Sequence, residues 1–156
     1  MKNLPFPALN LPAAELRIRR TEADAYEVFD FLRRRYVKLT PEEWVRQHFT
    51  HFLVEERGFP AGLLGNEVCV EVNGARRRCD SLLFDRQGLR PRLIAEYKAP
   101  TVVLTQDVFT QIQSYNSVLR ADYLVVSNGL THYVCRMDYA TARPEFLADI
   151  PHYEAL

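Results

Sequence analysis

The sequence has few of the features that mark a secreted, membrane-spanning or zinc-thiolate protein. Only three cysteines occur, Cys69, Cys79 and Cys135, and no two of them stand in CxxC spacing. An odd number of scattered cysteines excludes a disulfide framework and favours a reducing compartment. No apolar stretch approaches the roughly 20 residues of a membrane-spanning helix, and the N-terminus has no continuous apolar signal core. We therefore expect a cytoplasmic protein with no membrane partner.

An excess of charge of one sign is also lacking. The chain carries 20 basic and 20 acidic side chains, so its formal net charge is +0. The global basic field that drives strong non-specific DNA binding is thus excluded, and any DNA contact must come from local patches. Two arginine triplets, at 33–35 and 76–78, are candidate patches, although such runs are more often solvated faces. The absence of a glycine-rich phosphate loop argues against a hydrolase of small phosphoesters.

Length and composition favour a globular α/β protein of ordinary size. Of the 156 residues, 47% are hydrophobic and 26% are charged, which is typical of globular domains able to bury a core. We predict one domain over residues 1–156, with a core over about 38–150 and an N-terminal extension over 1–37. A short strand is predicted at Leu16 to Arg20. From Thr21 to Tyr36, a capping threonine, early acidic residues and late arginines favour a short helix or a loop with helical turns.

The first core helix has a well-defined start. Thr40 is a helix-capping residue, Pro41 suits the first helical position, and Glu43 completes a capping box. The helix is expected to run to Arg57 and to stop at Gly58. Its apolar residues recur at three- and four-residue spacing and predict one buried stripe, formed by Trp44, Val45, Phe49, Phe52 and Leu53.

Three strands, a helix and two further strands are predicted next. Alternating valines indicate a strand over 64–72, and Asn73-Gly74 is typical of a type I′ turn into a return strand over 78–84. A third strand over 93–98 completes a meander, and helical spacing predicts a helix over 105–119. The apolar run 123–126 indicates a doubly buried strand, followed by strands over 132–137 and within 143–156. The core order is therefore α-β-β-β-α-β, a central mixed sheet with a helix against each face.

The ends of the second and third strands carry a candidate catalytic group. Glu96 and Lys98 project from the same strand face, about 7 Å apart, and Asp80 lies beside them if the strands pair. Two carboxylates and an ammonium suit phosphodiester hydrolysis, in which a metal polarises the phosphate and activates water. Carboxylate oxygens favour Mg²⁺ or Mn²⁺ over zinc. Taken alone the spacing is also common on solvated strand edges.

The order of these motifs resembles the PD-(D/E)xK nuclease superfamily. More closely, it is similar to the N-terminal nuclease domain of type I restriction enzyme R subunits. The resemblance covers roughly residues 35–150, and Cys79 stands where the literal pattern has proline. The matching residues are RCD at 78–80, EYK at 96–98, QIQSY at 111–115, which fits the QxxxY element shared with RecB-like nucleases, and the helix that bears PEEWVRQHF.

The resemblance implies a restriction-endonuclease-like fold and a role for each matching residue. Asp80 and Glu96 would be metal ligands and Lys98 the catalytic lysine. Members often add a glutamate from the first helix. The candidate for this glutamate is Glu43, which is equally a capping-box residue, and Glu67 is a less favoured alternative. Three further residues would lie near the DNA or brace the site: Gln111, Tyr115 and Arg78.

Two functions from different classes follow from this reading. The first is a divalent-metal-dependent DNA endonuclease domain of a restriction or defence system, with restriction-modification or helicase subunits, or a second copy of the chain, as partners. The alternative is a catalytically inactive nuclease-fold module for DNA docking or oligomerisation, which the neutral net charge favours. His48 and His51 could hold a metal, but a histidine pair among phenylalanines is more often packing.

Overall fold

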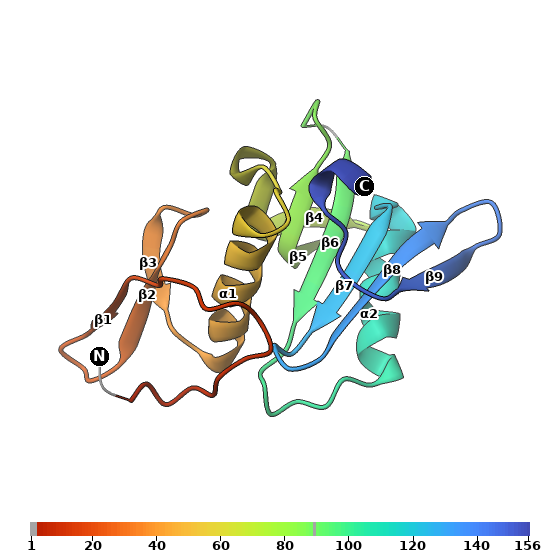
Figure 1. Cartoon of the computed structure of the whole chain (residues 1–156). Helices are drawn as coiled ribbons and strands as arrows, with labels where there is room; N and C mark the ends of the chain where they lie inside the picture. The colour runs from red at the N-terminus through yellow and green to blue at the C-terminus, as the bar shows by residue number, and fades with distance from the viewer. Residues whose placement is uncertain (1–2, 89) are drawn as a thin grey trace.

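The structure, a computed structural model, describes residues 3–88 and 90–156. It contains a small three-stranded sheet and a larger six-stranded sheet, which lie on opposite sides of helix α1 (Figure 1). The elements are β1 (Ile18–Arg20), β2 (Tyr26–Asp30), β3 (Arg35–Lys38), α1 (Pro41–Glu55), β4 (Leu64–Val72), β5 (Ala75–Phe84), β6 (Pro91–Tyr97), α2 (Gln106–Leu119), β7 (Tyr123–Ser127), β8 (His132–Asp138) and β9 (Arg143–Leu147), with short 3-10 turns at Ala61–Leu63 and Tyr153–Ala155.

The large sheet confirms the predicted core order. Its strands lie in the order β4-β5-β6-β7-β8-β9, with β6 and β7 parallel and every other neighbouring pair antiparallel. The α2 crossover makes the parallel pairing possible, because parallel neighbours need a long connection. Asn73 and Gly74, at φ angles of 52° and 78°, form the predicted tight turn between β4 and β5. The sheet is therefore mixed, as predicted.

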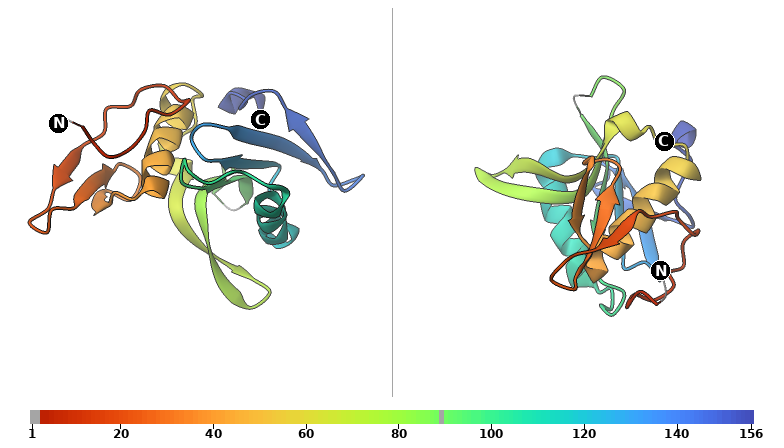
Figure 2. Two further views of the ribbon diagram at one scale, coloured as in Figure 1. Left: turned by 90° about the horizontal axis from the view of Figure 1, so that it is seen from below. Right: turned by 90° about the vertical axis from the view of Figure 1, so that its left-hand side faces the viewer.

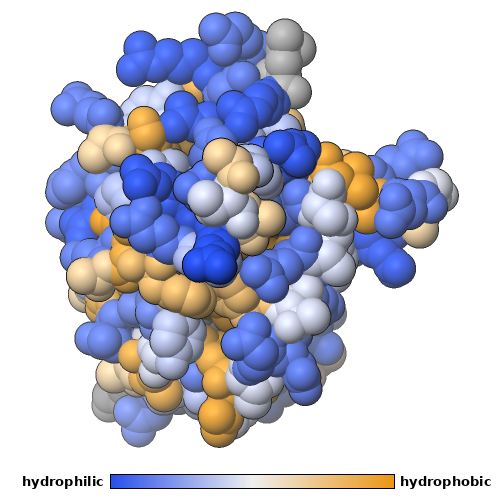
Figure 3. Space-filling view, turned by 90° about the vertical axis from the view of Figure 1, so that its right-hand side faces the viewer, coloured by the Kyte–Doolittle hydropathy of each residue, from blue (hydrophilic) through white to orange (hydrophobic). Residues whose placement is uncertain are grey.

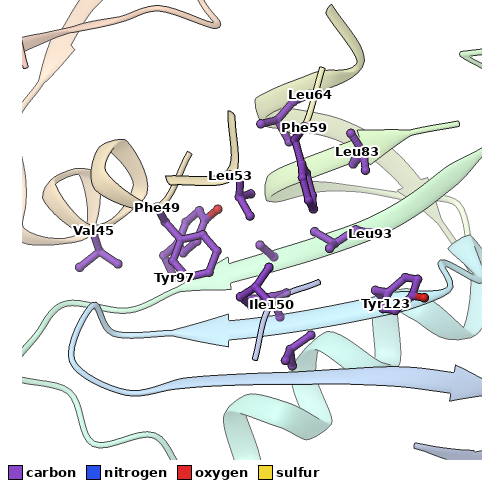
Figure 4. Close-up of a cluster of buried hydrophobic side chains, with 13 residues drawn as sticks. Val45, Phe49, Leu53, Phe59, Leu64, Leu83, Leu93, Tyr97, Tyr123 and Ile150 are labelled. Carbon is purple, nitrogen blue, oxygen red and sulfur yellow. The ribbon is translucent and has the colours of Figure 1, made fainter. Parts of the chain in front are cut away.

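The two helices cover opposite faces of this sheet. On one face Val45, Phe49 and Leu53 of α1 are fully buried against Leu93 and Tyr97 of β6 (Figure 4). The predicted stripe is confirmed at these three positions, whereas Trp44 and Phe52 are only partly buried. On the other face, Phe109 and Ile112 of α2 pack in a second buried cluster with residues of the sheet, which include Leu82, Ile94 and Leu124.

The predicted helix between Thr21 and Tyr36 is wrong, because this segment forms the β2–β3 hairpin. Its charged residues pair across strands and turns instead of with a helix dipole: Arg19 contacts Glu27 on the neighbouring strand at 2.6 Å. Asp30 closes the turn, since its Oδ1 accepts hydrogen bonds from the amides of Leu32 and Arg33. The order of charges along the chain therefore fits either structure, and strand pairing decided it.

The ends of α1 follow the predicted signals closely. The Thr40 hydroxyl accepts a hydrogen bond from the Glu43 amide at 3.0 Å, so the predicted cap is confirmed. The helix ends at Glu55, two residues before the predicted end, and Gly58 then takes a φ of 72°, which glycine adopts without strain. Among the described residues, no helix is long and apolar enough to span a membrane.

A fork between β5 and β6 positions the candidate site. The two strands pair from Phe84 back to Ser81, which lies opposite Ala95. Beyond that point β5 leaves β6 and continues with β4 as a two-stranded arm that projects from the body (Figure 2). We call the part of this hairpin from Glu67 to Asp80 the arm.

Candidate active site

Asp80 stands at the fork, where β5 separates from β6. Its Oδ2 accepts a hydrogen bond from the backbone amide of Tyr97 at 2.7 Å. The carboxylate thus replaces the strand partner that this amide loses as the strands diverge, because buried backbone donors need an acceptor. Continuing the Ser81–Ala95 register by one residue places Asp80 next to Glu96.

Glu96 and Lys98 complete the predicted group at the same place. The Lys98 Nζ lies 3.6 Å from Glu96 Oε1, and the glutamate is only 8% exposed. Burial, and then the nearby charge of Asp80, raise the pKa of Glu96 to about 7. Burial also raises the pKa of Asp80, although the Tyr97 amide and a neighbouring arginine act against it. The structure therefore brings the three predicted residues together, and the raised pKa values show that the positive charges nearby do not fully offset the burial of the two carboxylates.

That neighbouring arginine, Arg46 of α1, is a site residue that sequence reasoning missed. It is 6% exposed, and its Nη1 lies 2.8 Å from Glu43 Oε1. Its Nη2 lies 2.7 Å from Glu67 Oε1 and 3.1 Å from Asp80 Oδ1. Burial alone would lower the pKa of Arg46, but the three carboxylates raise it. The only local signal for this role was its position three residues after Glu43, on the same face of the helix.

Glu43 reaches Asp80 through Arg46. Its carboxylate also accepts hydrogen bonds from Arg33 Nη2 at 2.5 Å and from Gln47 Nε2 at 3.2 Å. The backbone amide of Glu43 serves the helix cap while its side chain belongs to the charged cluster. The structure thus confirms the part of the capping box that the Glu43 amide forms, and a catalytic role for its side chain stays a prediction. Glu67 is the acidic residue between Arg46 and Arg78, and its φ of 54° marks an irregularity in β4.

A chain of buried polar side chains lies behind the fork. The hydroxyl of Tyr97 donates to Ser81 Oγ at 2.9 Å, Ser81 donates to Asn66 Oδ1 at 2.6 Å, and Asn66 Nδ2 donates to Asp30 Oδ2 at 3.1 Å. Burial alone would raise the pKa of Asp30, but hydrogen bonds from Arg33 and Asn66 lower it below its usual value. This network joins the small sheet to three strands of the large one, and a fully bonded buried network holds its members in one arrangement.

The predicted DNA-side residues lie apart from the three residues at the fork. Gln111 Nε2 donates to the hydroxyl of Tyr115 at 3.0 Å, and both line a groove between α2 and the arm. Arg78 Nη1 lies 3.3 Å from Glu67 Oε2, with its side chain 70% exposed. Contacts with DNA remain a prediction for all three.

The hydrogen bonds of the two α1 histidines are to residues of the same helix, and the His51 ring also packs against Phe31, with ring centroids 4.5 Å apart. His48 Nδ1 is hydrogen-bonded to the Trp44 carbonyl at 2.8 Å, and His51 Nδ1 to Glu55 at 3.0 Å. Burial lowers the pKa of His48, which is typical of a packed neutral imidazole. In the described part of the chain, no three histidine, cysteine or acidic side chains form a ready-made metal-ligand group. Metal binding by Asp80 and Glu96 stays a prediction.

One family model covers most of the chain. The model of the family described as type I restriction enzyme R protein N terminus matches residues 41–151. The chain belongs to this family. The matched span of the R protein N-terminal family runs from the start of α1 past β9, so it includes Asp80, Glu96, Lys98 and Arg46 and leaves out the small sheet.

Two solved structures resemble the chain. One is a fragment described as an HsdR subunit of a type I restriction enzyme from Vibrio vulnificus YJ016, with 20% identity and a TM-score of 0.51, covering 72% of this chain and 24% of that one. It shows that the restriction-endonuclease-like fold is shared. The other is a DrdV–DNA complex, with 19% identity and a TM-score of 0.46 over 70% of this chain and 11% of that one. The chain thus spans a quarter or less of the length of either solved chain. A comparison with curated proteins found no match.

Proposed function

We propose that this R protein N-terminal domain is a divalent-metal-dependent DNA endonuclease domain of a restriction or defence system. The observation that carries the proposal is the meeting of Asp80, Glu96 and Lys98 at the fork between β5 and β6. A purely structural strand end has no need to bury two carboxylates whose like charges repel each other. Phosphodiester hydrolysis does need such a pair, with a cation and a nearby ammonium.

The donor set fits Mg²⁺ or Mn²⁺. Asp80 and Glu96 offer hard carboxylate oxygens. The raised pKa of both groups supports the proposal, because an added positive charge would stabilise the two ionised carboxylates. A divalent cation held there supplies Lewis-acid polarisation of the phosphate and a more acidic water.

The side chains around the two carboxylates have distinct tasks in this proposal. The Tyr97 amide and Arg46 hold the Asp80 carboxylate in one orientation. Lys98 brings an ammonium within 3.6 Å of Glu96, from where it can donate a hydrogen bond to the charge that develops on the attacked phosphate. The burial of Glu96 limits the water that would screen these charges.

DNA as substrate and other subunits as partners belong to this proposal as well. The matching family is described as the N terminus of a type I restriction enzyme R protein, and the chain covers only 24% of the similar HsdR fragment. We therefore expect the endonuclease to work with restriction-modification or helicase subunits. A homodimer remains a second arrangement, since cutting both strands needs two sites.

The alternative function is a catalytically inactive module that keeps the nuclease fold for DNA docking or oligomerisation. One observation favours it: the Arg46 guanidinium already places a permanent positive charge among Glu43, Glu67 and Asp80. If that charge satisfies the carboxylates, the fork would have little affinity for a metal.

Calorimetric titration with Mg²⁺ and Mn²⁺ separates the two functions. We expect the wild-type domain to bind the cation and Asp80→Asn and Glu96→Gln to lose at least tenfold in affinity. Asp149→Asn is the control, because it removes an exposed carboxylate that pairs with Arg57 and not with the fork residues. It should bind the cation like the wild type. Lys98→Ala should retain metal binding and lose cleavage of plasmid, linear and single-stranded DNA. Equal heats for the wild type and Asp80→Asn, with no cleavage, would favour the inactive module.

A further inference from the structure

The second arginine triplet is divided between the two sides of the arm. Arg78 pairs with Glu67 at 3.3 Å, and Arg76 lies across from Glu71 in the β4–β5 register. Arg77 lies across from Val70, and it forms no ion pair with any residue that the structure describes. Side chains alternate along a strand, so Arg77 points to the opposite side of the arm from its two neighbours. Its charge is therefore available to a partner.

The side of the arm that carries Arg77 faces helix α2 across a groove. The groove has a volume of about 490 Å³, within the roughly 300–1,000 Å³ of ordinary binding clefts. It is open to solvent beside the arm, which stands out at the right of the molecule in Figure 3. None of its lining residues has a carboxylate; they are Val72, Asn73, Ala75 and Arg77 from the hairpin and Gln111, Ser114 and Tyr115 from α2.

We propose that this groove binds the sugar–phosphate backbone of a DNA strand. Arginine presents a planar fork of donors that matches a phosphate, and glutamine, serine and tyrosine side chains are common phosphate contacts. The groove offers this set and no opposing negative charge. The inference rests on the proposed function, because it names the surface that would lead the substrate to the fork.

The hydrogen bonds inside the groove leave donors for a phosphate. Gln111 Nε2 donates one proton to the Tyr115 oxygen, so the phenolic proton and the second amide proton remain available. Ser114 already donates its proton to the Gln111 carbonyl, so its hydroxyl oxygen is an acceptor here. The resemblance already implies that Gln111 and Tyr115 lie near the DNA, and Arg77 is the phosphate contact that the structure adds.

The groove lies at a suitable distance from the fork. Arg77 is three residues before Asp80 on β5, which corresponds to roughly 10 Å along an extended strand. A DNA strand rises about 3.4 Å per nucleotide in the duplex, so the same span corresponds to about three nucleotides. The distance along β5 between the groove and Asp80 is therefore a few nucleotides long.

Fluorescence anisotropy with labelled DNA tests the groove without cleavage. The titration uses a short duplex and the matching single strand, in EDTA, so that binding does not depend on a metal. We expect Arg77→Ala to weaken binding about tenfold for every DNA sequence and to reduce the slope of log affinity against log salt by about one. The matched control is Arg143→Ala, which removes an exposed arginine from the edge strand β9 on the far side of the sheet.

The outcomes distinguish the groove from the catalytic proposal. Equal affinities for Arg77→Ala and Arg143→Ala would overturn the groove, even if the wild type cleaves DNA. Lost binding in Arg77→Ala would support it, even if no variant cleaves. Tyr115→Phe provides a second measurement, because it removes one donor and keeps the ring; we expect a loss of several-fold in affinity with an unchanged thermal unfolding transition. Retained affinity in both variants would also refute the groove.

Discussion

At the scale of single residues, the fork places charges where water screens them poorly. Glu96 is 8% exposed and lies beside Asp80, with Lys98 at 3.6 Å as its ion-pair partner. Such an arrangement is unfavourable for the metal-free fold, because an ionised carboxylate loses hydration and meets a like charge. We interpret it as stability given up for a site that a cation would complete.

Glu96→Gln should therefore stabilise the metal-free protein at alkaline pH. Burial and the Asp80 charge raise the pKa of Glu96 from 4.5 to about 7 on folding. Over that pH range the folded chain binds more protons than the unfolded chain, so the free energy of unfolding falls as the pH rises. The glutamine variant lacks this titration. We expect it to be more stable than the wild type by about 1–3 kcal/mol at about pH 8 and by much less at about pH 4.

Urea unfolding in EDTA at both pH values measures this difference. Glu145→Gln, at an exposed position of β9, serves as the control and should show the same small effect at both. A gain for Glu96→Gln that does not change with pH would contradict the assigned cause.

At the scale of elements, α1 is covered on two sides. Its apolar side packs against the large sheet, and the side that carries Glu43, Arg46 and Gln47 is also buried, between the two sheets (Figure 1). Buried polar groups need partners. Glu43 pairs with Arg33, and Arg46 pairs with Glu67 and Asp80. Gln47 Nε2 donates to Glu43. The helix thus carries core residues and site residues at once, and its N-terminal cap holds the first turn that bears Glu43.

The two helix caps provide a matched pair for a stability test. Thr40 accepts a hydrogen bond from the Glu43 amide, whereas the side chain of Thr105 makes no capping hydrogen bond at the start of α2. We expect Thr40→Ala to lower the free energy of unfolding by about 1 kcal/mol and Thr105→Ala by less than about half of that. Chemical denaturation of both variants measures the difference, and equal losses would show that the hydroxyl of Thr40 is not what stabilises α1.

At the scale of the whole molecule, the N-terminal segment is joined to the family core by buried polar contacts. Arg33 donates a hydrogen bond to Glu43, and Asp30 accepts one from the side-chain amide of Asn66. At the same end of α1, the Trp44 indole donates to the Pro7 carbonyl at 2.9 Å. The family match begins at residue 41, so this segment lies outside it, yet it closes the network behind the fork. We infer that it acts as part of the same folding unit.

Removal of residues 1–38 should therefore destabilise the family core. It leaves Glu43 and Asn66 with fewer partners in a buried setting, and breaking a buried ion pair typically costs about 3–5 kcal/mol. We expect a loss of more than about 3 kcal/mol in the free energy of unfolding. Arg19→Ala is the control within the same segment, since it removes only the exposed Arg19–Glu27 pair and should cost less than about 1 kcal/mol. A truncated chain as stable as the full one would show that the extension is independent.

Local signals determined most of the core. The Thr40-Pro41 start, the Asn73-Gly74 turn, the strand alternation and the apolar run at Tyr123 each depend on neighbouring residues, so these elements were predictable. The meeting of Asp80 with Glu96 and Lys98 was also predictable, because alternation and the meander determine which side chains share a strand end. Metal binding there stays a prediction.

Tertiary structure alone decided the rest. Charged residues of the 21–36 segment fit a helix or a hairpin equally well by themselves, and only pairing with β1 selected the hairpin. Arg46 became a site residue because α1 is covered on both sides, and Arg77 acquired its groove because β5 separates from β6 beyond Ser81. In each case the deciding partner is distant in sequence. Burial determines which charged side chains must pair, and that burial exists only once the chain has folded.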